Sequence, residues 1–232
     1  MSDADWSLHT GSLGTSDVLR GVSTAYGTPN GGDIFAFGFR SVSNNAGVVA
    51  LSNNQSNFYP IASGKGVSVR GAVKRGTTAD DYAIMLYGAM EDKNVTADGY
   101  LLGFTEDEDA AHLVLIKGSP SDGILTTSSG ILRTSNGTYN RNTWYHFRLD
   151  IIAQGWGDTH IQLFENADLA TDPVTAPDWQ PIAGMSEYID DQNGVQSGST
   201  PFNGGYAGFA FYTGAIGRTA FVDHVQVARQ TT

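Results

Sequence analysis

Ten short apolar segments, separated by connections rich in Gly, Asn, Asp and Ser, constrain the fold of this chain more than any other feature. No segment repeats apolar residues at helical spacing over two turns, whereas several alternate apolar residues with small or polar ones. The segments are 34–43, 46–52, 66–76, 81–90, 99–105, 111–118, 143–153, 159–166, 205–214 and 219–228. So many strands with very little helix predict an all-β fold of two antiparallel sheets packed face to face as a sandwich.

Local signals predict how these strands are connected. Asn44 and Asn45 form a hairpin-like pair between the first two segments. One short helical turn is expected within 184–192. Residues 1–33 are poor in apolar residues and end in the turn-rich "YGTPNGGD", which predicts an N-terminal arm or loops with at most one short strand. The strand pattern continues from there without a break, so we predict a single domain over 34–232.

Composition excludes several classes of function. The formal net charge is −11, with 24 acidic and 13 basic residues, which argues against nucleic-acid or anionic-membrane partners. The absence of Cys excludes disulfides, zinc–thiolate sites and a cysteine nucleophile. The N-terminus lacks the basic and apolar regions of a signal peptide, and no apolar run reaches the roughly 20 residues of a membrane span. We therefore expect a soluble protein without a classical signal peptide.

The stretch "NTWYHFRLDII", 142–152, poses the clearest question about a site. On a strand, its apolar residues from Tyr145 to Ile151 share one face, and His146, Arg148 and Asp150 share the other. We interpret the polar row as a solvent or partner face, with diagonal neighbours on the next strand at His160 and Gln162. A metal site between the two histidines is an alternative, although a polar sheet face explains them as well.

The last third of the chain resembles a known fold. "NTWYHFRLDII", "GDTHIQLFEN", "GGYAGFAFYTG" and "TAFVDHVQV" follow the strand order and hydrophobic pattern of the laminin-G and legume-lectin-like jelly roll, over about 90 residues. This resemblance to the concanavalin A-like fold implies a jelly-roll arrangement of the two sheets.

A second resemblance concerns function. "GVSVRGAVKRG", "GYLLGFTEDEDAAHLVLIKG" and "TAPDWQPIAGMSEYIDDQNGVQSGSTPF" are similar to phrases in structural proteins of tailed bacteriophages and prophages. The resemblance implies a non-enzymatic virion protein made in the host cytoplasm. It would be a capsid decoration (cement) protein or a tail component that contacts the major capsid protein or tail proteins. A homo-oligomer is expected, with a trimer as one option.

The basic cluster Arg70, Lys74 and Arg75 is the candidate partner contact in that interpretation. Arg70 and Lys74 share a strand face, and such a patch suits an acidic capsid surface. The cluster serves equally well as a positive stripe that limits edge-to-edge aggregation.

The alternative function is a carbohydrate-binding, lectin-like module, on a virion or secreted. Sugar sites combine an exposed aromatic ring with hydrogen-bonding side chains. The candidates are Trp156, Trp179 and Tyr139, of which Trp156 lies between two glycines at an expected hairpin tip.

Acidic residues supply the remaining candidates. Asp190, Asp191 and Asn193 resemble a calcium loop, so bound Ca²⁺ is an option, against a plain Asx-rich turn. The same fold also houses glycoside hydrolases, whose chemistry needs two carboxylates that flank the scissile bond. The acidic run Glu106 to Asp109 is consecutive, so a strand would send its carboxylates to opposite faces. We therefore expect no enzymatic activity.

Overall fold

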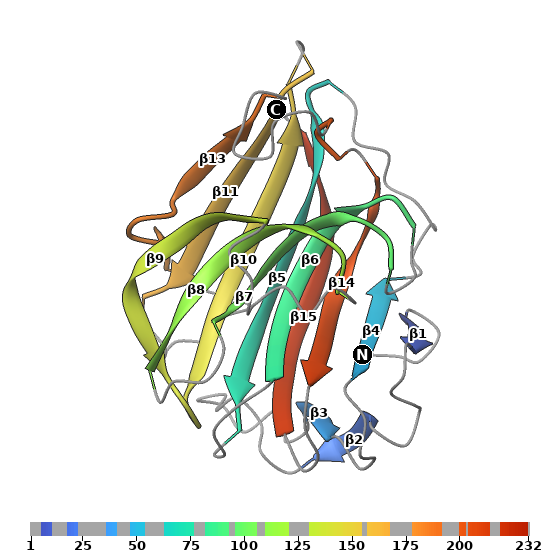
Figure 1. Cartoon of the computed structure of the whole chain (residues 1–232), viewed down its shortest axis with the longest axis vertical. Coiled ribbons are helices and arrows are strands. Elements are labelled where there is room, and N and C mark those ends of the chain that lie inside the picture. The colour runs from blue at the N-terminus through green and yellow to red at the C-terminus, as the bar shows by residue number, and fades with distance from the viewer. Residues whose placement is uncertain are drawn as a thin grey trace.

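The chain folds as two antiparallel β-sheets that lie one above the other (Figure 1). The structure, a computed structural model, describes residues 6–10, 18–22, 36–40, 47–53, 63–76, 82–92, 96–105, 110–120, 130–154, 157–167, 178–191, 200–202, 204–213 and 219–231. These residues contain no α-helix, and hence no helix of a length and apolarity that would span a membrane. The all-β sandwich predicted from the sequence is confirmed.

Sheet A has seven strands in the order β1-β4-β14-β6-β7-β8-β9. Their bounds are β1 Trp6–Thr10, β4 Gly47–Asn53, β14 Tyr206–Thr213, β6 Tyr82–Met90, β7 Gly99–Phe104, β8 Ala110–Gly118 and β9 Ile131–Asn140. In Figure 1, β7, β8 and β9 curve across in front of β10 and β11 of the other sheet.

Sheet B has eight strands, ordered β12-β11-β10-β5-β15-β3-β2, with β13 also paired to β11. The bounds are β2 Val18–Val22, β3 Ala36–Arg40, β5 Lys65–Arg75, β10 Trp144–Ala153, β11 Thr159–Asn166, β12 Trp179–Pro181, β13 Glu187–Asp190 and β15 Thr219–Thr231. Every strand pairing among the described residues of both sheets is antiparallel.

One apolar core fills the space between the sheets, because alternate residues of each strand point inward. Sheet B contributes Val67, Phe147 and Leu163 among others, and sheet A contributes Leu102 and Phe104. The inward row of β10 is the apolar face predicted for "NTWYHFRLDII". Within it, the Phe147 ring meets Phe104 across the two sheets, edge to face at 5.9 Å. The inward rows fix which side chains of sheet B face away from the core.

All ten predicted strands are present, but some of their connections differ from expectation. β3 and β4, expected to form a hairpin, lie in different sheets, so the chain crosses the sandwich between them. The stretch expected to hold a helical turn forms β13 instead. Tyr188 and Asp190 of β13 alternate inward with outward Glu187 and Ile189, which is a strand period.

Five strands were not among the ten segments: β13, described above, the three-residue β12, and β1, β2 and β9. The stretch 1–33 contributes β1 at the edge of sheet A and β2 at the edge of sheet B. β9 lies within a Gly/Ser/Thr-rich stretch, and its pairing with β8 has two register shifts. These irregularities break the alternation by which a strand is recognised in sequence. The division into an arm over 1–33 and a domain over 34–232 stays a prediction.

Candidate functional site

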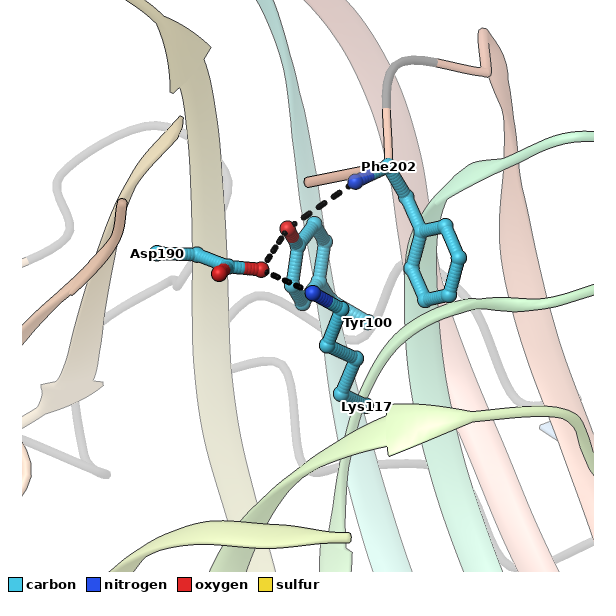
Figure 2. Close-up of polar contacts among 4 residues, drawn as sticks. All are labelled: Tyr100, Lys117, Asp190 and Phe202. Carbon is cyan, nitrogen blue, oxygen red and sulfur yellow. Dashed lines mark hydrogen bonds and ion pairs between the residues drawn. The ribbon is translucent and has the colours of Figure 1, made fainter. Parts of the chain in front are cut away.

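A buried polar network links the two sheets at Asp190. The Asp190 carboxylate on β13 accepts hydrogen bonds from the Tyr100 hydroxyl and the Lys117 ammonium group, both at 2.6 Å. The backbone N–H of Phe202 donates to the Tyr100 hydroxyl oxygen at 3.1 Å, as Figure 2 shows. Burial, followed by the contact with Asp190, raises the pKa of Tyr100, so its hydroxyl remains a neutral donor.

This network bears on the prediction that Asp190 is a calcium ligand. Lys117 already neutralises the carboxylate at salt-bridge distance, so a cation would have to displace a buried ammonium group. Asp191 is exposed next to it, and Asn193 lies outside the described residues. No three His, Cys, Asp or Glu side chains group as metal ligands anywhere in the described ranges. Asp190 is therefore a structural residue and does not fit a calcium ligand.

The second candidate site is the outer face of sheet B, where cations and aromatic rings alternate. We call the set Arg70, Lys74, Arg148, Trp144, Phe164, Trp179 and Phe221 the cationic face. These residues come from β5, β10, β11, β12 and β15, and each strand places them opposite its inward core row. Except for buried Lys74, all are partly exposed.

Lys74 lies between two aromatic rings at one end of this face. In the strand register, Lys74 of β5 lies opposite Trp144 of β10 on one side and opposite Phe221 of β15 on the other. The ammonium nitrogen is 5.2 Å from the Trp144 ring centre and 4.8 Å from that of Phe221. Burial lowers the pKa of Lys74, and the negative faces of the two rings stabilise its charged form.

Arg148 occupies a similar position farther along the face. Its guanidinium carbon lies 4.1 Å from the Phe164 ring centre and 5.2 Å from that of Trp179. Its Nε is 3.1 Å from Oδ2 of Asp150, and the Ser68 hydroxyl donates to Oδ1 of Asp150 at 2.5 Å. Burial raises the pKa of Asp150, although Ser68 and Arg148 both favour its charged form. The guanidinium is thus held flat by stacking and by a carboxylate.

Arg70 lies directly opposite Arg148 in the pairing of β5 with β10. Its Nε donates to Oε1 of Gln226 at 3.0 Å, and its Nη2 donates to the same oxygen. A bulge in β15 between Asp223 and Gln226 sets this contact, because the extra residue turns Gln226 to the outer face opposite Arg70. His224, within the bulge, has a φ of 49°, a conformation uncommon outside glycine.

The structure divides the candidates predicted from sequence. Trp179 lies on the cationic face, whereas Trp156 lies outside the described residues. Tyr139 is only 6% exposed, and its hydroxyl donates to Glu165 at 2.8 Å, so it offers no open ring to a ligand. Arg75 is 3% exposed and donates to the carbonyl oxygen of Tyr139 at 2.5 Å. Arg75 therefore does not join Arg70 and Lys74 in a surface patch, because its odd spacing turns it inward.

The polar row of β10 is also more enclosed than a solvated face. His146 is 1% exposed, and its ring packs against Trp179 with centres 4.8 Å apart. In the register of β10 with β11, Gln162 is the diagonal neighbour of Arg148 and His160 is the diagonal neighbour of Asp150, as expected. His160 itself lies opposite Ile152. His146 and His160 are therefore about 20 Å apart along the strands, at ~3.3 Å a residue. They do not form the metal pair considered from the sequence.

Sequence reasoning missed Trp144, Phe164 and Phe221 as members of this face, and Gln226 as the hydrogen-bond partner of Arg70. The aromatic residues each occupy an outward position of a strand, but only the strand pairing brings them beside Lys74 and Arg148. The result is a sheet face that combines aromatic rings, positioned cationic donors and a carboxylate. Such a surface suits the binding of a polar ligand that also has apolar faces.

The fold resembles several solved structures at low sequence identity. The carbohydrate recognition domain of Emp46p, in its metal-free form, matches with a TM-score of 0.54 and 8% identity, over 97% of this chain and 88% of that one. A Bacillus subtilis protein of unknown function with a galectin-like fold matches with a TM-score of 0.54 and 13% identity, over 99% and 91%. The carbohydrate recognition domain of Emp47p gives 0.50 and 9%, over 100% and 99%.

No protein-family model and no curated protein sequence matches the chain. The comparisons give no support to a bacteriophage origin, so the virion role stays a prediction. At such low identities the structural likeness shows the fold alone, and that fold is a galectin-like, concanavalin A-like β-sandwich.

Proposed function

We propose that this protein is a carbohydrate-binding domain without catalytic activity, and that the cationic face is its binding surface. The observation that carries the proposal is the arrangement around Arg148, where a fixed guanidinium and a carboxylate adjoin partly exposed aromatic rings. Sugars present hydroxyl groups to such donors and acceptors, and their C–H faces pack on aromatic rings. The likeness of the fold to the carbohydrate recognition domains of Emp46p and Emp47p supports the proposal.

The arrangement also favours binding over reaction. The one carboxylate in contact with Arg148, Asp150, is buried and accepts hydrogen bonds from Ser68. Its oxygens contact Ser68 and Arg148, so Asp150 presents no exposed carboxylate to a glycosidic bond. Hydrolysis of a glycosidic bond needs a second carboxylate across the substrate, and none of the contacts around Arg148 supplies it.

A glycan array followed by calorimetry on the wild-type protein tests this proposal. We expect a glycan to bind, and Trp179→Ala to weaken its binding at least tenfold, because the ring contributes to the surface beside Arg148. Ile189→Ala is the matched control, since Ile189 is 44% exposed on the same sheet and lies outside the cationic face. Absence of binding to any glycan would remove the proposed function. An equal loss of glycan affinity in Trp179→Ala and Ile189→Ala would place the binding site outside the cationic face.

A further inference from the structure

We infer that the cationic face selects an acidic glycan, whose carboxylate or sulfate groups bind between Arg70 and Arg148. This inference rests on the proposed function and goes further, because it names the chemical class of the ligand. The observation behind it is the direct pairing of two arginines on adjacent strands of a chain with a net charge of −11.

Like charges that lie directly opposite one another across two strands destabilise a sheet. Arg70 and Arg148 are in this position, and the pKa of Arg70 is lowered by burial and then by the charge of Arg148. Arg70 is bonded to the neutral amide of Gln226, so its hydrogen bond removes none of the repulsion. A bound anion would remove it, which gives an acidic ligand an advantage that a neutral one lacks.

The carboxylates on this face are placed to neutralise only part of its charge. Asp150 contacts Arg148, and Asp223 lies near His224, with Nε2 and Oδ2 3.8 Å apart. Lys74 adds a third cation four residues along β5 from Arg70, on the same side of the strand. Glu187 of β13 also points outward but lies against His160, and no ion pair among the described residues includes Arg70, so the charge of Arg70 has no carboxylate partner there.

Both guanidinium groups are also oriented before a ligand arrives. Arg148 is stacked on Phe164, and Arg70 is held by Gln226 through Nε and Nη2, the groups on one edge of its plane. The edge formed by the two Nη groups is the one that remains for a ligand. A planar guanidinium binds a carboxylate or a sulfate through two parallel N–H bonds, and prior orientation lowers the entropy lost on binding.

Matched pairs of ligands test the inference on the full-length protein by calorimetry at an ionic strength of about 0.1 M. One arm compares polygalacturonate with its carboxyl-reduced form, and the other compares heparin oligosaccharides with their desulfated form. We expect the acidic member of at least one pair to bind ten times more tightly than its neutral form. The two arms distinguish a carboxylate ligand from a sulfate ligand.

The variants Arg70→Gln and Arg148→Gln connect this preference to the arginine pair. Each is expected to bring the ratio of acidic to neutral affinity close to one. Lys65→Gln is the charge-matched control, because Lys65 is an exposed cation at the start of β5 and lies outside the cationic face. It should leave the ratio within about twofold, since exposed charges beyond a Debye length of roughly 10 Å are largely screened.

A stability measurement separates binding from folding in these variants. Arg70→Gln removes the repulsion between the paired guanidinium groups, so its urea midpoint should be equal to or above that of the wild type. Equal binding of the acidic and neutral forms would overturn the inference and leave the proposed function intact. If the protein bound neither the acidic form, nor the neutral form, nor any other glycan, the proposed function itself would be removed. An acidic preference that survives both arginine variants would also overturn the inference.

Discussion

Lys117 and Asp190 form an ion pair whose side chains are only 2% and 4% exposed. Two buried charges depend on each other, because removal of one leaves the other in a low-dielectric environment without compensation. We therefore expect Lys117→Met to lower the free energy of unfolding by about 3–5 kcal/mol, as measured by urea denaturation. The loss would be far larger than the value of a surface ion pair, which is about 0–1 kcal/mol.

The double variant Lys117→Met/Asp190→Leu separates the charge from the packing. With both charges removed, the site has no unpaired ion, so the double variant should be more stable than Lys117→Met alone. Thr134→Ala, on an exposed position of β9, is the control and should change stability by no more than about 0.5 kcal/mol. A Lys117→Met variant as stable as that control would show that the ion pair contributes little.

Individual side chains of the site were predicted from sequence only as far as their own strand allows. The sequence predicts Trp179 as a binding residue because it is aromatic, and the structure places it on the cationic face. The sequence predicts Asp190 as a calcium ligand because residues with side-chain oxygen atoms cluster around it. Its true partner, Lys117, lies 73 residues away and is brought to it by the packing of one sheet on the other. A motif of adjacent residues carries no information about such a partner.

At the scale of the strand, the close approach of β5 and β10 depends on Gly66. A Cβ at this position would overlap the carbonyl oxygen of Ile151 and lie 2.8 Å from the Cα of Ile152. These are backbone atoms of the paired strand, which cannot move aside as a side chain does. We expect Gly66→Ala to lower the free energy of unfolding by about 1–3 kcal/mol in thermal or urea denaturation, as overpacking usually does.

Gly137 on β9 offers a matched control for this substitution. A Cβ there would have no atom within 4 Å. Gly137→Ala should be neutral or stabilising by up to about 1 kcal/mol, because alanine restricts the unfolded chain more than glycine does. Equal effects of the two substitutions would show that β5 and β10 separate without cost at Gly66.

Strands with regular alternation were predictable, and the irregular ones were not. β10 and β11 pair in unbroken register and match the predicted segments closely. β9 was missed because its register with β8 shifts twice, which disrupts the period of two. Asn44-Asn45 has the residues of a hairpin, yet β3 and β4 belong to different sheets. Turn chemistry describes only the connection itself, whereas sheet membership is decided by distant strands.

At the scale of the whole molecule, the fold places the apolar residues between the two sheets and two paired arginines on the outer face of sheet B. The apolar core is continuous between the sheets, while the net charge of −11 belongs to the chain as a whole. Against that background, the pairing of β5 with β10 brings Arg70 and Arg148 directly opposite one another on the outer face of sheet B. The fold therefore concentrates on one surface a charge that the composition alone would not suggest.

The shared core predicts that both sheets unfold together. Leu102 and Phe104 of sheet A pack in the same cluster as Phe147 and Leu163 of sheet B, so opening of either sheet exposes apolar side chains of the other. Chains above about 150 residues often unfold through intermediates. A single cooperative transition would therefore distinguish one folding unit from two separate sheets. We expect tryptophan fluorescence and far-ultraviolet circular dichroism to give coincident urea transitions. Leu102→Ala should lower both midpoints equally, through a loss of about 2–5 kcal/mol. A shift seen by one probe alone would mean that the two sheets are separate folding units, because the loss in sheet A would not reach sheet B.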